Sequence, residues 1–94
     1  MEISERCIAQ LEKEGLTSVY EWSDDPGTVY PEHQHLGKVT IFVTDGSMDF
    51  TLAGVTYSLV TGDRIDIPPH IPHSAFVGSQ GVQFVVGEEI VGDS

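Results

Sequence analysis

A chain of 94 residues has room for one domain, because a domain with its own core usually needs on the order of 100 residues. Its hydrophobic share of 39% is that of an ordinary globular protein and excludes a disordered or collagen-like chain. The formal net charge of −11 repels nucleic-acid phosphates and anionic lipid headgroups, so we expect no nucleic acid and no membrane as a partner.

The start of the sequence lacks the features of a targeting signal. It has no basic cluster followed by an apolar run, and no stretch of the sequence is long enough to cross a bilayer. We therefore expect a cytoplasmic protein. The single cysteine, Cys7, has no internal disulfide partner, and we expect it to be a small buried side chain.

The N-terminal segment has the periodicity of a helix. Its apolar side chains recur at helical spacing, at Ile3, Cys7, Ile8 and Leu11. Ser4 is the candidate N-cap, and Gly15 stands where a left-handed residue commonly ends a helix. We predict one short amphipathic helix over about residues 4–14, whose apolar stripe covers part of the structure that follows.

The rest of the chain, from about residue 17 to about residue 90, has the pattern of short strands. Runs rich in β-branched and aromatic residues are interrupted by Gly, Pro or Asp about every eight to twelve residues. They predict strands at 17–22, 27–31, 38–44, 47–52, 55–59, 64–67, 73–77 and 83–88. Asp45-Gly46 and Ala53-Gly54 are predicted turns. We infer an all-β fold, a small antiparallel barrel or sandwich with few exposed edges.

Three histidines form the densest chemical signal. His33 and His35 are separated by one residue, and on a strand such residues point to the same face. His73 lies on another predicted strand and can complete a set of three imidazoles. Three neutral nitrogen ligands suit a divalent transition metal and leave positions open for water or substrate. A barrel in which these histidines bind no metal is the alternative.

Two segments around these histidines resemble the two motifs of the cupin family. The first has, in order and at the family's spacing, Gly27, His33, His35, Val39 and Gly46. The second has, in the same way, Gly62, Pro68, His70 and His73. The resemblance implies a single cupin domain over residues 1–94, a jelly-roll-like antiparallel β-barrel. It also implies that His33, His35 and His73 bind one divalent metal, which can be Fe, Zn, Ni, Cu or Mn.

The chain departs from the family's pattern in ways that bear on the site. Val39 stands where the family usually has a glutamate ligand, so the resemblance implies a three-histidine centre without a carboxylate. A divalent ion there would keep its full formal charge and be a stronger Lewis acid. His70 stands where a glycine is usual; we expect an exposed turn residue, with a fourth ligand or proton shuttle as the alternative.

Alternation along the strands predicts an apolar pocket beside the histidines. Inward-facing candidates are Val39, Ile41 and Val43, with some of Met48, Phe50, Leu52, Phe76, Phe84 and Val86. Candidate polar contacts are Tyr30, Tyr57 and Gln83. Asp66, between two isoleucines, is expected to point away from the core; pointing inward, it could act as a base or ligand. Such a pocket favours a small, partly hydrophobic molecule.

Three aromatic residues suggest self-association. Phe42 is expected to face outward from its strand, and Tyr20 and Trp22 lie on an early strand. Exposed aromatic side chains on a sheet face favour pairing of two copies, so we predict a homodimer. The alternative is that the N-terminal helix covers these side chains.

The main functional hypothesis is a metalloenzyme, a dioxygenase or a related enzyme in which the metal activates dioxygen or polarises a small oxygen-bearing substrate. A second is a non-catalytic module that binds or senses a small ligand or a metal. A third is an isomerase that works without metal and uses a histidine base with Tyr30 or Tyr57 as the acid.

Overall fold

The computed structural model describes residues 2–89. Within them one helix precedes an all-antiparallel set of strands, which confirms the predicted fold class. The elements are, in chain order, α1 (Ile3–Lys13), β1 (Ser18–Asp24), β2 (Val29–His33), β3 (Val39–Leu52), β4 (Val55–Val60), β5 (Arg64–Ile67) and β6 (His73–Glu88). No helix in this part of the chain has the length and apolar character needed to cross a membrane.

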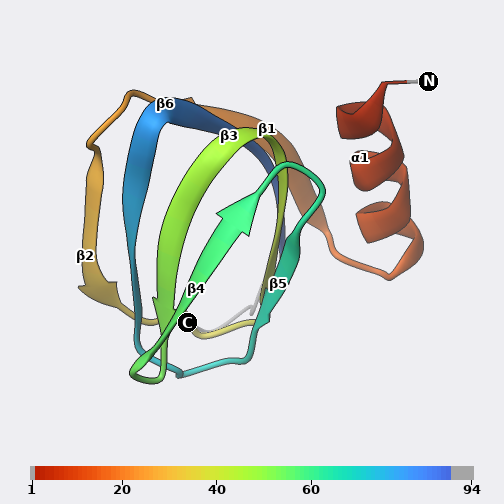
Figure 1. The fold of residues 1–94 in the computed structure, drawn as a ribbon. Coiled ribbons are helices and arrows are strands. Elements are labelled where there is room, and N and C mark those ends of the chain that lie inside the picture. Colours follow the sequence, from red (N-terminus) through yellow and green to blue (C-terminus); the bar gives the residue numbers. More distant parts are fainter. Residues whose placement is uncertain (1, 90–94) are drawn as a thin grey trace.

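Strands β3 and β6 are long, and they pair with each other through both halves of the barrel. The second half of β6 also pairs with β1, and the first half of β3 pairs with β5. The first half of β6 pairs with β2, and the second half of β3 pairs with β4. The two strands therefore bend around the core and close most of a barrel, with α1 outside it (Figure 1).

The bend in β3 shows that the predicted turn at Asp45-Gly46 is wrong. The strand continues through these residues, and its register against β6 shifts on either side of Gly46. Gly46 has a φ of 76°, and a Cβ there would lie 2.1 Å from the carbonyl oxygen of Gly81. The glycine thus permits a bulge at which two backbones approach closely. The predicted break between residues 77 and 83 is also absent, because β6 runs through it.

The other predicted turn, Ala53-Gly54, is confirmed. It joins β3 to β4 as a two-residue hairpin connection, with Leu52 paired to Val55. Both turn residues have positive φ, 50° and 83°, as a type I′ turn requires. Ala53 therefore adopts a backbone conformation that is unusual for a residue with a side chain.

Two apolar clusters lie on opposite faces of the sheet that contains β1, β6, β3 and β5. The inner cluster fills the barrel with side chains that include Val43, Val77 and Ile67, all almost fully buried. The outer cluster lies under α1 and consists of Cys7, Leu11, Leu16 and Val85, with Ile8, Val19 and Phe42 packed against it. The predicted burial of Cys7 and the covering role of the helix are both confirmed.

The helix begins one residue earlier than predicted and is capped differently. Its N-cap is Glu2, which makes no side-chain capping hydrogen bond, so the assignment of Ser4 as N-cap is wrong. Gly15 has a φ of 92° and follows the end of the helix, as predicted. The helix is held in place mainly by its buried stripe.

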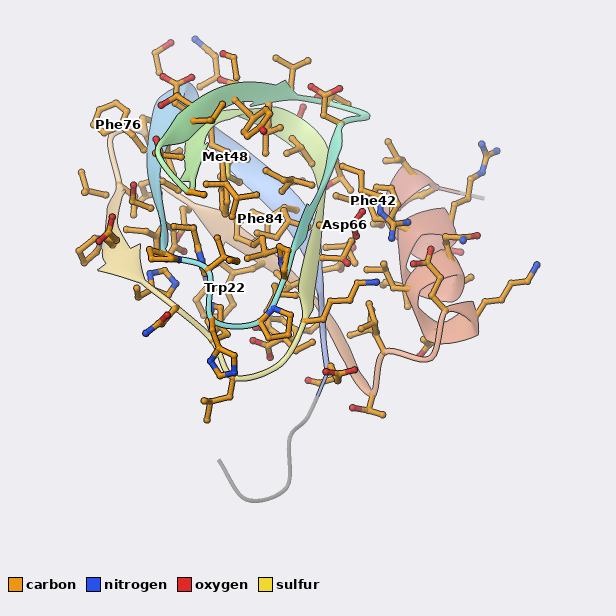
Figure 2. The ribbon with its side chains drawn as sticks, turned by 90° about the horizontal axis from the view of Figure 1, so that it is seen from below. Trp22, Phe42, Met48, Asp66, Phe76 and Phe84 are labelled. Carbon is orange, nitrogen blue, oxygen red and sulfur yellow. The ribbon has the colours of Figure 1, made fainter. Side chains whose placement is uncertain are left out.

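The aromatic residues do not form the common sheet face predicted from the sequence. Phe42 does point outward, but towards α1, whereas Tyr20 and Trp22 pair with the inward-facing Val86 and Phe84 (Figure 2). Phe76, one of the inward-facing candidates, points outward and is 52% exposed. The homodimer remains a prediction, which sedimentation equilibrium would test.

Candidate metal centre

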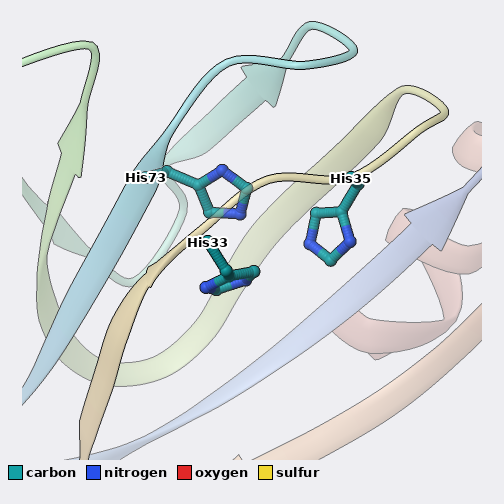
Figure 3. Close-up of side chains that lie close together, drawn as sticks. All are labelled: His33, His35 and His73. Carbon is teal, nitrogen blue, oxygen red and sulfur yellow. The ribbon is translucent and has the colours of Figure 1, made fainter.

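The three predicted ligands lie at the rim of the barrel, at the end of β2, in the segment after β2 and at the start of β6. His33 is the last residue of β2, and it pairs directly with His73, the first residue of β6. His35 lies in the segment between β2 and β3, so the expectation that it shares a strand with His33 is wrong. The three side chains meet nevertheless, because the chain after β2 turns back towards the start of β3 (Figure 3).

The three imidazoles are close enough to share one ion. Their ring centroids are 4.3 Å apart for His33 and His73, 4.9 Å for His33 and His35, and 5.0 Å for His35 and His73. One nitrogen of each ring lies within 4.8 Å of the corresponding nitrogens of the other two. Nitrogen ligands about 2.0–2.1 Å from a metal lie at most about 4 Å from one another, so small side-chain adjustments would complete the site.

Backbone carbonyls set the tautomer of two of the rings. Nδ1 of His33 lies 2.8 Å from the carbonyl oxygen of Pro31, and Nδ1 of His73 lies 2.9 Å from that of Ile71. A carbonyl oxygen only accepts, so each Nδ1 carries the hydrogen and donates it. In the neutral ring this leaves the Nε2 lone pair available for a metal, which is the arrangement usual for metal-binding histidines.

Burial favours the neutral, metal-binding form of two of the imidazoles. His73 is 3% exposed and stacks on Phe50, with ring centroids 5.6 Å apart. Loss of solvent lowers the pKa of His73, partly opposed by its hydrogen bond to Ile71, and loss of solvent likewise lowers the pKa of His35. Neither ring therefore needs to lose a proton at neutral pH before it binds an ion. The donor set of three neutral nitrogens fits a divalent transition metal.

A cavity of about 290 Å³ opens beside the three histidines. Its wall is almost entirely apolar. The lining residues are Tyr20, Trp22, Tyr30, His33, His35, Val39, Ile41, Met48, Phe50, Ile67, His73, Ser74, Ala75, Phe84, Val86 and Glu88. Among the candidate polar contacts, Tyr30 lines the cavity, whereas Tyr57 and Gln83 do not. The cavity is at the lower end of the size range of small-molecule pockets.

His70 and Asp66 both lie outside this cavity, as expected. His70 is an exposed residue with a φ of 65°, and its backbone N–H donates to the carbonyl oxygen of His35. Asp66 pairs with Thr40 on the outer face, where it accepts hydrogen bonds from Thr40 and Arg64. His70 therefore belongs to the turn, and Asp66 belongs to the polar contacts that attach the helix.

The sequence prediction missed residues that β1 and β6 bring to the cavity. Tyr20, Trp22 and Glu88 line it, yet none lies in a motif. Trp22 Nε1 donates to Asp24, which also accepts a short hydrogen bond from the Tyr30 hydroxyl. Alternation from Phe84 and Val86 would have placed the β1 aromatics on the cavity side of the sheet, where they are 39% and 54% exposed, had the pairing of β1 with β6 been known.

Comparison with known proteins identifies the family. Residues 20–86, well over half of the chain, match the profile described as Cupin domain. The chain belongs to the cupin family. It is also 36% identical, over 64 residues, to quercetin 2,3-dioxygenase of Bacillus subtilis (strain 168), an alignment that covers 67% of this chain and 19% of that enzyme. The chain thus spans about a fifth of the length of this curated relative.

Solved structures show the same fold. An RmlC-like cupin from Shewanella frigidimarina NCIMB 400 superposes with a TM-score of 0.72 at 23% identity, over 80% of this chain and 67% of that one. Oxalate decarboxylase of Bacillus subtilis, studied for its Mn(II) centres, superposes with a TM-score of 0.69 at 21% identity, over 81% of this chain and 22% of that one. At these identities the likeness establishes the fold alone.

Proposed function

We propose that the chain binds one divalent transition metal through His33, His35 and His73 and uses it in the oxygen-dependent oxidation of a small, largely apolar molecule. The observation that carries the proposal is the convergence of the three imidazoles, two of which already donate the hydrogen of Nδ1 to a backbone carbonyl oxygen. A bound ion of this kind would supply open coordination positions for an oxygen-bearing ligand and a centre for reaction with dioxygen.

The residues around the site support a small apolar substrate. Phe50 holds the ring of His73 by stacking, and the cavity wall beside the histidines is almost entirely apolar. A cavity of about 290 Å³ suits a molecule about the size of a single substituted ring. Because one relative of this chain is named a dioxygenase, we propose oxygenation as the reaction class, without carrying over that enzyme's substrate.

The cavity gives less support to the metal-independent isomerase. That chemistry needs an acid opposite the histidine base, and Tyr57 lies outside the cavity. The hydroxyl of Tyr30 donates to Asp24, and burial together with this contact raises the pKa of Tyr30 to about 12. A proton held so firmly is poorly suited to transfer near neutral pH.

Metal content tests the first part of the proposal. The chain, purified without a polyhistidine tag, is analysed for metals and then titrated separately with Fe(II), Mn(II), Ni(II), Cu(II) and Zn(II). We expect about one ion per chain, and at least a hundredfold weaker binding in His73→Ala, because changes to outer-shell partners alone cost about 10–100-fold. Less than about one ion per few chains, with no uptake on addition, overturns the proposal.

Oxygen consumption tests the second part. The metal-loaded chain is mixed with small phenols and enols, with catechol as the first probe, and dissolved oxygen is followed with an electrode. We expect uptake that depends on both metal and probe and that is lost in His73→Ala. Metal and probe binding without oxygen uptake would identify the chain as a binding or sensing module instead.

A further inference from the structure

Among the described residues 2–89, Glu88 is the one carboxylate that lines the cavity. It lies on β6 directly opposite Val39 of β3. Residues opposite each other in an antiparallel pair project from the same face of the sheet, with Cβ atoms about 4.5–5.5 Å apart. The Cβ of Glu88 therefore lies beside Val39, which occupies the position where the family's motif usually has a glutamate.

Glu88 shares a cavity with the histidine cluster. His33, His35 and His73 line the same cavity of about 290 Å³ as Glu88. Tyr20 of β1 also lines this cavity, and burial followed by the negative charge of Glu88 raises the pKa of Tyr20. Glu88 is thus a half-buried residue of the cavity that Tyr20 and His35 also line.

We propose that Glu88 supplies, from the neighbouring strand, the negative charge that the three-histidine centre lacks at Val39. The inference rests on the proposed metal site. Glu88 is not one of the three residues whose donor atoms converge, so it acts through its charge from outside the ligand set. Its charge strengthens the hold on a divalent cation and weakens the attraction of that cation for anionic ligands.

These two effects have opposite signs, and this gives a sharp test with Glu88→Gln, which keeps the size of the side chain and removes its charge. Zn(II) affinity is measured by competition with a chelator, and azide affinity from the visible spectrum of the Co(II)-loaded chain. We expect Zn(II) to bind about tenfold more weakly and azide to bind several-fold more tightly. A variant that merely disturbed the pocket would bind both more weakly.

Glu21→Gln is the matched control. Glu21 is exposed on β1 and pairs with Val85 of the outer cluster, so it faces away from the cavity while its substitution changes the net charge equally. Both affinities should stay within about twofold of the wild type, because exposed charges at a distance are screened. A Zn(II) loss in Glu21→Gln equal to that in Glu88→Gln would overturn the inference, since net charge alone would then explain both.

The double variant Val39→Glu, Glu88→Gln moves the carboxylate to the motif position. We expect its Zn(II) affinity to recover to at least that of the wild type. Wild-type Zn(II) and azide affinities in Glu88→Gln would overturn the role of Glu88 and leave the proposed function standing. A wild-type chain that binds no metal would overturn the proposed function, and this inference with it. If the double variant does not fold, the comparison of Glu88→Gln with Glu21→Gln still tests the inference.

Discussion

The outer and inner sides of the barrel wall differ in how their polar groups are paired, although alternate residues of the same strands face the two sides. On the outer face Arg64 forms ion pairs with Glu14 and Asp66, at 2.6 Å and 2.9 Å, and its guanidinium lies 5.0 Å from the ring of Phe42. These charges satisfy one another. At the rim of the barrel interior, His33 of β2 and His73 of β6 each donate the hydrogen of Nδ1 to a backbone carbonyl and keep Nε2 available.

This difference separates a face that attaches an element from a face that can bind a ligand. Leu11 and Val85 are fully buried in the outer cluster, so α1 closes that face. The inner face keeps a cavity, although apolar side chains could have filled it. An open apolar cavity next to donor atoms with free lone pairs is what a ligand site requires.

The largest expected effect comes from Gly46→Ala, which breaks the junction on which both faces depend. The new Cβ would meet the backbone of Gly81 at 2.1 Å, in a left-handed conformation, so we expect about 5 kcal/mol of destabilisation, measured by chemical denaturation. Gly54→Ala is the control, because its φ is 83° but no atom lies within 4 Å; about 1 kcal/mol is expected. Equal losses at the two sites would contradict the close approach.

Phe50→Ala breaks the inner face selectively. Phe50 is 3% exposed and stacks on His73, so we expect a loss of about 4 kcal/mol in unfolding free energy and about tenfold weaker Zn(II) binding. Leu59→Ala is the control, since Leu59 is buried in the same cluster but does not line the cavity. It should lose about 3 kcal/mol and bind Zn(II) as the wild type does.

Leu11→Ala breaks the outer face selectively. Its side chain lies on α1 and is fully buried between the helix and the sheet, so we expect a loss of about 3 kcal/mol in unfolding free energy by chemical denaturation. Zn(II) affinity should be unchanged, because none of the side chains of the outer cluster lines the cavity. A change of more than about threefold would show that the two faces are coupled through β6.

The smallest effect concerns the ion pair of the outer face. Hydrogen bonds from Arg64 and Gln10 lower the pKa of Glu14 to about 2, from an ordinary value of 4.5. A carboxyl whose folded pKa is lowered stabilises the fold above its unfolded pKa, and the contribution disappears as pH falls from about 4.5 to about 2. The melting temperature of Glu14→Gln should therefore be slightly below that of the wild type at pH 7, with a smaller difference at pH 3. A constant difference would contradict this assignment.

The sequence predicted those parts of the molecule that depend on local pattern. Helical spacing identified α1, alternation placed Val39, Ile41 and Val43 inside, and motif spacing identified the three histidines that the structure brings together. It failed at Asp45-Gly46, because a glycine with positive φ serves a bulge as well as a turn, and only the partner strand distinguishes the two.

What the sequence did not reveal depends on register between distant strands. Glu88 follows Val39 by 49 residues, and their proximity results from the pairing of β3 with β6. Tyr20 and Trp22 were predicted to be exposed, and they are 39% and 54% exposed. Their place at the cavity was not foreseen, because one strand alternates equally well in either phase. Phe76 was one of the inward-facing candidates for the same reason, but its neighbours Ala75 and Val77 are the residues that face the core.

The short hydrogen-bonded loops formed by Pro31 with His33 and by Ile71 with His73 have an evolutionary consequence. In each, the carbonyl that orients the ring lies two residues earlier in the same chain segment. One contact that orients each of these two ligands is thus encoded within three consecutive residues, and Phe50 adds its stacking on His73. Substitutions elsewhere in the barrel can reshape the cavity while both hydrogen bonds are kept, so one pair of tripeptides can persist while the chemistry around it diversifies.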